Sequence, residues 1–161
     1  MRIGYGYDSH RFAEGRRRRL VLGGVEFVGE TGLLGHSDAD VLTHAIIDAL
    51  FGAAALGDIG SHFPDTDVKW KDADSTKLLS AAVAELRAAG HEIVNVDAIV
   101  ICERPRLGPH IDEMRQRLAA VMGVKVDAVS VKGKTNEGLD DIGAGRGIAV
   151  HAVALLEEKK V

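Results

Sequence analysis

The apolar residues of this chain recur with two different periods, and this alternation limits the folds that it can adopt. Over residues 2–7 they alternate with a period of two, which is typical of a strand. Over residues 42–53 they recur at helical spacing. Strands interleaved with helices predict a single domain over residues 1–161. We expect an α/β domain of the α+β type, with a mixed sheet and helices packed on one of its faces.

Turn residues and the apolar periods together predict the order of the elements. We expect strands over 2–7, 18–30 (turning at Gly23 and Gly24), 94–101 and 128–135, and helices over about 42–56, 75–89 and 110–122. Residues 147–158 fit a strand, a helix or both, and residues 57–74 are expected to form a loop. Ser37, three residues before Asp40, resembles the start of a capping box and predicts the beginning of the first helix.

Composition argues against several classes of function. The formal net charge is −4 and aromatic residues make up 4% of the chain, so we expect neither a basic face for nucleic acid nor a stacking platform for bases. Residues 16–19 are the only basic block, which we interpret as a solvated loop or as a patch that steers an anionic ligand. Cys102 is the only cysteine and lies in an apolar run, which predicts a buried small residue rather than a nucleophile.

The sequence shows neither a membrane-spanning nor a targeting segment. No apolar stretch reaches the roughly 20 residues that a membrane span requires, and no signal peptide opens the sequence. We therefore expect no membrane partner, and a cytoplasmic protein or the mature part of an imported one.

Asp8 and His10 are the first candidate ligands of a metal ion. Two residues apart on a strand, they leave the same face as Gly4 and Gly6, which we expect to leave open space beside them. A carboxylate oxygen and an imidazole nitrogen aimed at one point suit a divalent metal. The alternative is a hydrogen-bonded pair at the end of a strand.

His44 is the third candidate ligand. At about 100° per residue it projects away from the apolar stripe of its helix, on a polar face shared with Asp40 and Asp48. It is therefore either a solvent-facing residue or part of a site built above the sheet. In the second case Asp8, His10 and His44 would form a three-ligand zinc site with an open fourth position, and Asp48 or a backbone carbonyl could orient the imidazole.

Two further groups of residues suit an anionic, hydroxylated ligand. His36 and Ser37 lie at the start of a helix, which favours either an anion or plain capping. Asp58 suits sugar hydroxyls or a turn.

The segment VKGKTNEGL, residues 131–139, carries groups that suit phosphate. Lys134 and Thr135 can contact phosphate oxygens, and Glu137 suits a magnesium ion shared with them. The order of a P-loop is absent, and the alternative is a polar turn.

Taken together, these motifs resemble one family, the 2-C-methyl-D-erythritol 2,4-cyclodiphosphate synthases of the non-mevalonate isoprenoid pathway. The matching stretches are RIGYGYDSHRF, LLGHSDADVLTHAIIDALFGAAALGDIGSHFPDTD, RPRLGPHI and VKGKTNEGL. They span nearly the whole chain in the family's order.

The resemblance implies a homotrimer with active sites between subunits. Each would convert 4-diphosphocytidyl-2-C-methyl-D-erythritol 2-phosphate into the cyclodiphosphate by attack of the 2-phosphate on the β-phosphorus, with release of CMP. It implies one Zn²⁺ per subunit on Asp8, His10 and His44, and Mg²⁺ or Mn²⁺ on Glu137. His36 and Thr135 would polarise phosphate as catalytic residues.

The same resemblance implies a set of substrate-binding residues, with the cytidine pocket contributed by the neighbouring chain. They are Asp8, Ser9, His10, His36, Ser37, Asp58, Ile59, Gly60, Phe63, Pro64, Asp65, Thr66, Asp67, Cys102, Glu103, Arg104, Pro105, Arg106, Leu107, Gly108, Lys134, Thr135, Asn136 and Glu137.

One stretch departs from the family's pattern. Asp140 and Asp141 stand where a glycine and an aromatic residue are usual, Ala144 replaces arginine, and Arg146 replaces glutamate. In the family this segment lines the trimer axis, where an isoprenoid diphosphate is a further ligand. Two added acids would weaken anion binding there unless Arg146 compensates.

Two other functions fit the same residues. A zinc-dependent phosphoester or nucleotide hydrolase would place water in the open metal position. A non-catalytic trimer would bind a nucleotide or an isoprenoid diphosphate without turnover.

Overall fold

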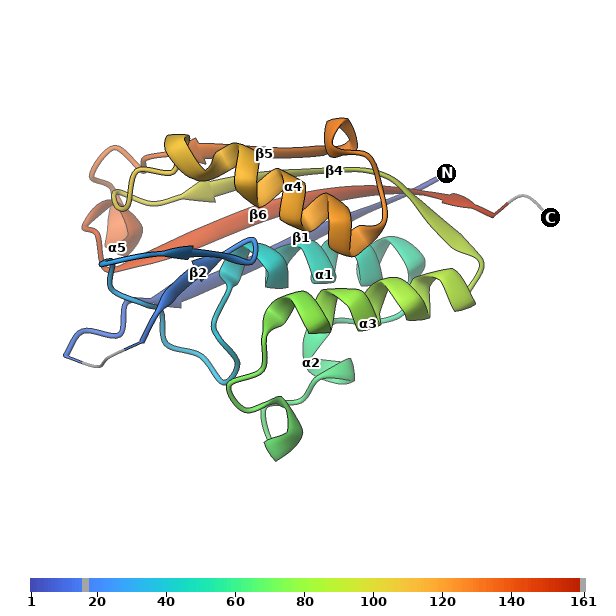
Figure 1. Cartoon of the computed structure of the whole chain (residues 1–161), viewed down its shortest axis with the longest axis horizontal. Helices are drawn as coiled ribbons and strands as arrows, with labels where there is room; N and C mark the ends of the chain where they lie inside the picture. Colours follow the sequence, from blue (N-terminus) through green and yellow to red (C-terminus); the bar gives the residue numbers. More distant parts are fainter. Residues whose placement is uncertain (16–17, 160–161) are drawn as a thin grey trace.

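The computed structural model describes residues 1–15 and 18–159 and forms a sheet covered on one face by helices (Figure 1). In chain order the elements are β1 (Arg2–Arg11), β2 (Leu20–Leu22), β3 (Val25–Phe27), α1 (Val41–Ala54), α2 (Ile59–His62), α3 (Ser75–Ala88), β4 (His91–Ile101), α4 (Ile111–Met122), β5 (Val129–Lys134), α5 (Asp140–Gly143) and β6 (Gly147–Glu158). The predicted strands and the three longer helices are confirmed. Among the described residues, no helix is both long and apolar enough to cross a membrane.

The main sheet is mixed, as predicted, with the strand order β1-β6-β4-β5. Strand β6 lies antiparallel between β1 and β4, whereas β4 and β5 are parallel. Residues 147–158, which the sequence left open between strand and helix, therefore form a strand with backbone hydrogen-bond partners on both sides. Strands β2 and β3 form a separate two-stranded hairpin that turns at Gly23 and Gly24.

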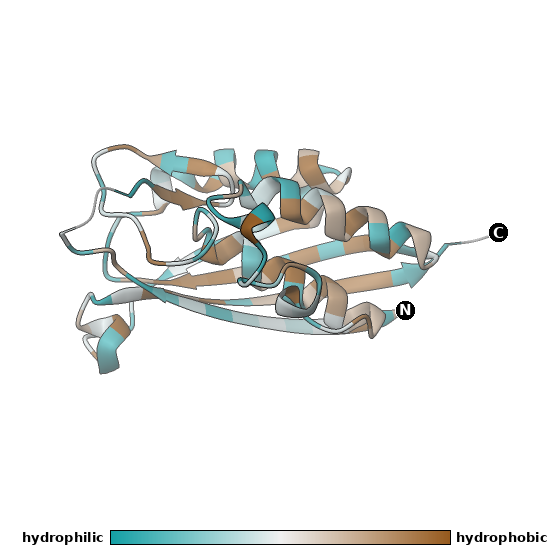
Figure 2. Ribbon diagram, turned by 90° about the horizontal axis from the view of Figure 1, so that it is seen from below, coloured by the Kyte–Doolittle hydropathy of each residue, from teal (hydrophilic) through white to brown (hydrophobic). Residues whose placement is uncertain are grey.

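Helices α1, α3 and α4 bury the apolar face of the sheet. The core includes Leu42, Ile46 and Leu50 of α1, all with no exposed surface. Figure 2 shows hydrophobic segments along the helices and along the strands that they cover. The opposite face of β1 exposes Ile3, Tyr5 and Tyr7.

The glycines of β1 determine how closely α1 approaches the sheet. A Cβ atom at Gly4 would lie 2.0 Å from the carbonyl oxygen of Ala49, and one at Gly6 would lie 2.0 Å from the carbonyl oxygen of Ala45. The expectation of open space beside these glycines is therefore wrong, because the backbone of α1 occupies it. The absence of side chains allows the helix to rest directly on the strand.

Helix α1 begins later than the capping-box pattern predicts. Its N-cap is Asp40 and not Ser37, because the Asp40 carboxylate accepts hydrogen bonds from the backbone N–H and the hydroxyl of Thr43, at 3.0 and 2.7 Å. The same carboxylate accepts the backbone N–H groups of Gly23 and Gly24, at 2.9 and 2.8 Å. Asp40 thus fastens the β2–β3 turn to α1 and does not belong to a polar face around His44.

The basic block at residues 16–19 lies partly outside the described residues, which resume at Arg18. The guanidinium of Arg18 donates to the carbonyl oxygens of Gly35 and Ser37, and that of Arg19 pairs with Glu26 at 3.2 Å. Arg18 therefore supports the loop that precedes α1, whereas Arg19 forms an exposed ion pair with β3.

Candidate functional site

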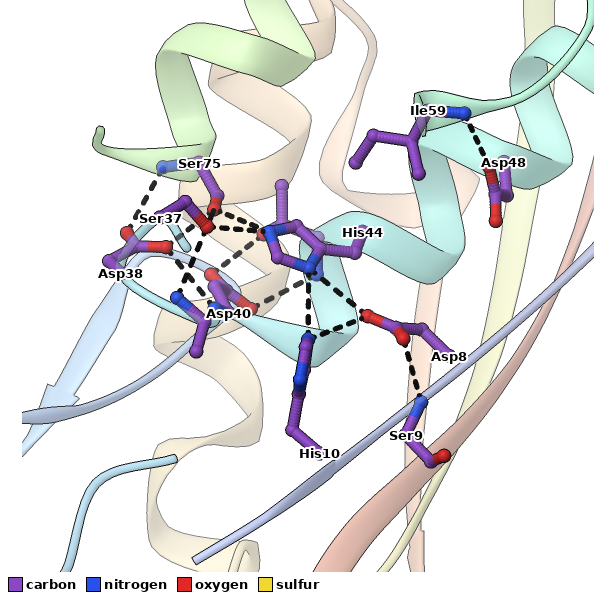
Figure 3. A network of polar contacts seen from close by, with 12 residues as sticks. Asp8, Ser9, His10, Ser37, Asp38, Asp40, His44, Asp48, Ile59 and Ser75 are labelled. Carbon is purple, nitrogen blue, oxygen red and sulfur yellow. Dashed lines mark hydrogen bonds and ion pairs between the residues drawn. The ribbon is translucent and has the colours of Figure 1, made fainter. Parts of the chain in front are cut away.

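Asp8, His10 and His44 meet at one point between β1 and α1 (Figure 3). The Asp8 Oδ2 atom lies 3.1 Å from His10 Nε2 and 3.1 Å from His44 Nδ1. The two imidazole nitrogens are 3.3 Å apart. Of the alternatives left open for His44, burial excludes the solvent-facing one, since the residue is only 8% exposed.

These three distances suit a small divalent cation. For a tetrahedral zinc ion with bonds of about 2.0–2.1 Å, neighbouring ligand atoms are separated by about 3.3–3.4 Å. The observed separations of 3.1–3.3 Å are close to that value. One carboxylate oxygen and two imidazole nitrogens also form a donor set that zinc accepts. The residues present therefore fit a metal ion with a remaining open position.

The electrostatics of the cluster agree with this geometry. Burial by itself would raise the pKa of Asp8, but hydrogen bonds with His10 and His44 and their charges outweigh it, and the pKa lies below its usual value. Burial would lower the pKa of His44, but the hydrogen bond and charge of Asp8 outweigh it, so this pKa is raised. Both shifts have the same cause: the cluster favours positive charge beside the Asp8 carboxylate.

Hydroxyl groups, and not Asp48, contact the second nitrogen of His44. His44 Nε2 lies 2.9 Å from Ser75 Oγ and 3.1 Å from Ser37 Oγ. Asp48 instead accepts the backbone N–H of Ile59 at 2.8 Å, so the expectation that it orients the imidazole is wrong. Sequence reasoning missed Ser75; the available signal was a small polar residue at the start of an apolar helix.

A cavity of about 510 Å³ opens beside the three candidate ligands. Its other lining residues lie between Gly35 and Leu78 in the chain, namely Gly35, His36, Ser37, Asp48, Ile59, Gly60, Phe63, Pro64, Asp65, Trp70 and Leu78. Most of the predicted sugar-diphosphate residues are therefore beside the candidate metal centre. Asp58, Thr66 and Asp67 are not in the lining, although the carbonyl oxygen of Asp67 lies 3.3 Å from His36 Nε2.

Asp58 acts as the N-cap of α2. Its carboxylate accepts hydrogen bonds from the backbone N–H and the hydroxyl of Ser61, at 2.8 and 2.6 Å. This is the turn role that the sequence left open. The carboxylate is at the surface, and these hydrogen bonds lower its pKa.

A second cavity, of about 450 Å³, contains most of the predicted cytidine-binding residues. It is lined by Cys102, Glu103, Pro105, Arg106, Leu107, Gly108, Pro109, Ile111, Gly133, Lys134 and Thr135. Arg104 is not in the lining, and its guanidinium lies over the ring of Phe12. Burial, with the charge of Glu103, raises the pKa of the Cys102 thiol to about 11, as expected for an inert cysteine.

The loop that follows β5 is tied to this second cavity. The Thr135 hydroxyl donates to Glu137 at 3.0 Å, and the backbone N–H of Asn136 donates to Glu103 at 2.9 Å. The two cavities have no lining residue in common. Most of the predicted site residues of the described chain therefore lie along one or the other of two separate cavities.

The segment that departs from the family's pattern forms α5 and the turn after it. Arg146 pairs with Asp141 at 2.7 Å, and both side chains are largely exposed. Asp140 accepts the backbone N–H of Ile142 at 2.7 Å and the side-chain amide of Asn136 at 2.9 Å. The charge of Arg146 is thus already balanced by a neighbouring acid.

Comparisons with known proteins agree with these features. The model of the YgbB family matches residues 1–157. A curated 2-C-methyl-D-erythritol 2,4-cyclodiphosphate synthase from Gloeobacter violaceus is 58% identical, over 98% of this chain and 96% of that relative. A solved 2C-methyl-D-erythritol-2,4-cyclodiphosphate synthase in a CDP-bound form superposes with a TM-score of 0.87 at 40% identity, over 97% of this chain and 100% of that one.

A larger protein contains the same fold. The bifunctional IspDF from Campylobacter jejuni superposes with a TM-score of 0.93 at 39% identity, over 98% of this chain. This chain spans only 42% of that protein. Because the family model and a curated relative both cover nearly its whole length, this chain belongs to the YgbB family.

Proposed function

We propose that this protein cyclises 4-diphosphocytidyl-2-C-methyl-D-erythritol 2-phosphate to 2-C-methyl-D-erythritol 2,4-cyclodiphosphate and releases CMP. The observation that carries the proposal is the meeting of Asp8, His10 and His44 at 3.1–3.3 Å beside a cavity, in a chain whose curated relatives bear this enzyme's name.

The reaction demands charge neutralisation and positioning more than a protein nucleophile. The substrate's own 2-phosphate oxygen attacks the β-phosphorus while CMP leaves, and several negative charges must come together. We assign Zn²⁺ to Asp8, His10 and His44, and Mg²⁺ or Mn²⁺ to Glu137. When bound, these cations would polarise the phosphate under attack and neutralise charge on the leaving group.

The chain's own residues would hold the substrate on both sides of the reacting phosphorus. His36, which lines the first cavity, and Thr135, which lines the second, would donate hydrogen bonds to phosphate oxygens, and the Thr135 hydroxyl would turn from Glu137 to do so. Residues 59–60 and 63–65 would enclose the sugar diphosphate, and residues 102–108 the cytidine. Such positioning lowers the entropic part of the barrier.

We further propose a homotrimer in which each active site joins the first cavity of one subunit to the second cavity of its neighbour. Two observations support it. The two halves of the site share no lining residue within one chain. The uncovered face of β1 exposes Ile3, Tyr5 and Tyr7 at 72%, 60% and 49%, which is costly unless another surface covers it.

Zinc analysis together with a product assay tests this function. The purified protein should contain about one zinc per chain, and it should release CMP together with a cyclic product. His44→Ala should lose both zinc and turnover. The matched control is His91→Ala, because His91 begins β4 and lines neither cavity.

The nature of the product separates the cyclase from a hydrolase. A linear product released with CMP would contradict the cyclase, and ligand binding without turnover would contradict any enzyme. Glu137→Gln should raise the magnesium concentration needed for half-maximal rate. A trimer should appear as three chain masses in light scattering, and a monomer would contradict the shared site.

A further inference from the structure

We propose that Ser75 and Asp38 position His44 by fixing which of its ring nitrogens carries the proton, so that Nδ1 is left free to bind the cation. This inference rests on the proposed function, because it assumes that His44 is a metal ligand. Ser75 and Asp38 are positioning residues: they lie on the far side of the His44 ring from the point where Asp8, His10 and His44 meet (Figure 3).

The hydroxyl group of Ser75 donates its proton in a hydrogen bond to Asp38. Ser75 Oγ donates to Asp38 Oδ1 at 2.5 Å, and the backbone N–H of Ser75 donates to Asp38 Oδ2 at 3.0 Å. A carboxylate only accepts hydrogen bonds, so the direction of this pair is fixed. The Ser75 oxygen can therefore offer only a lone pair to a third group.

That third group is His44 Nε2, which lies 2.9 Å from Ser75 Oγ. If Nε2 also presented a lone pair, two acceptors would face each other inside the protein. The contact is favourable only when Nε2 carries a proton and donates it. In the neutral imidazole, Nδ1 then has the lone pair, and Nδ1 is the atom that lies beside Asp8 and His10.

Ser37, the other neighbour of His44 Nε2, does not determine which ring nitrogen of His44 carries the proton. Its oxygen accepts the backbone N–H of Ala39 at 3.2 Å and lies 3.1 Å from Nε2 and 3.5 Å from Ser75 Oγ, so its hydroxyl proton has two possible acceptors and no carboxylate among them. It can rotate to donate to Nε2 or to accept from it. The relay through Ser75 therefore decides the tautomer.

Burial makes this relay effective. Ser75 has no exposed surface and His44 is 8% exposed, so solvent does not compete for the hydrogen bond between them. The relay also joins distant parts of the chain, because Asp38 precedes α1 and Ser75 begins α3. A residue at the start of α3 thus orients His44, the candidate metal ligand that α1 contributes beside β1.

Ser75→Ala removes the acceptor and tests the relay. Zinc affinity, measured by competition with a chelator on the purified full chain, should fall about 10–100-fold, the usual cost of losing such a partner. The matched control is Thr76→Ala, whose hydroxyl donates to Asp74 at 2.6 Å in the same helical turn and does not contact His44. That variant should bind zinc as tightly as the wild type.

Asp38→Asn, nearly isosteric, is the second variant and reverses the relay. Its amide can donate to Ser75 Oγ, which frees the serine proton for His44 Nε2 and favours the proton on Nδ1. Nitrogen NMR of the metal-free protein, at a pH where His44 is neutral, should show the proton on Nε2 in the wild type and a shift toward Nδ1 in the variant.

Two results would overturn the inference: a folded Ser75→Ala protein with wild-type zinc affinity, or a wild-type His44 with its neutral proton on Nδ1. Neither result depends on the reaction catalysed. If the wild type binds no zinc, or forms no cyclic product, the proposed function fails instead, so the two failures are distinguishable.

Discussion

Gly6→Ala should damage the candidate metal centre from outside it. The added methyl would lie 2.0 Å from the carbonyl oxygen of Ala45 and 2.7 Å from the backbone nitrogen of Ala49. Both atoms belong to the backbone of α1, so no side chain can rotate away. Because a carbon and an oxygen need more than about 3 Å, the helix and the strand must separate by about 1 Å.

That displacement acts directly on the three candidate ligands, since Asp8 and His10 lie on β1 and His44 lies on α1. A gap of about 1 Å exceeds the roughly 0.5 Å tolerance of a preorganised site. We expect zinc affinity to fall by about tenfold or more. The overpacked contact should also lower the free energy of unfolding by about 1–3 kcal/mol.

Chelator competition and urea unfolding of the metal-free protein measure these two effects. The matched control is Gly52→Ala on α1, the helix that packs against Gly6. There the added methyl would lie 3.8 Å from its nearest neighbour, the carbonyl oxygen of Tyr5. This substitution should stabilise the protein by about 0.5–1 kcal/mol, because alanine is the better helix former. Wild-type stability and wild-type zinc affinity in Gly6→Ala would refute the reasoning.

Three further predictions follow from the buried groups. Asp40→Ala should lower the free energy of unfolding by about 2–4 kcal/mol in urea titrations, because it leaves buried N–H groups unpaired, whereas the exposed cap variant Asp74→Ala should cost only about 1 kcal/mol; equal losses would contradict this. In the metal-free protein, the raised pKa of His44 contributes stability below about pH 6.5 that is lost as pH rises through the folded pKa, so its melting temperature should fall toward pH 9, and His44→Gln should lessen that fall. Iodoacetamide at pH 7.5 should leave Cys102 unmodified until the chain unfolds, since burial raises its thiol pKa to about 11; rapid labelling of the folded protein would show the thiol to be accessible.

Local pattern sufficed for most of the elements because each depends on neighbouring residues. The period of two over residues 2–7 predicts β1 and also places Asp8 and His10 on one face. The apolar stripe over residues 75–89 predicts α3, which ends at Ala88. Residues 147–158 resisted this reasoning, because Ala149, Val153 and Leu155 make the second face of β6 apolar as well, and the alternation that distinguishes a strand from a helix is lost.

In the candidate site, too, some features follow from local sequence pattern and others only from the tertiary structure. By itself, the sequence determined the spacing of Asp8 and His10, the helical position of His44 and the family to which the chain is similar. Only the tertiary structure decided that α1 rests on Gly4 and Gly6, that His44 meets the other two ligands, and that Ser75 holds its far nitrogen. The physical reason is that strand and helix periods act over a few residues, whereas these contacts join residues more than 30 positions apart and exist only where packing closes the distance.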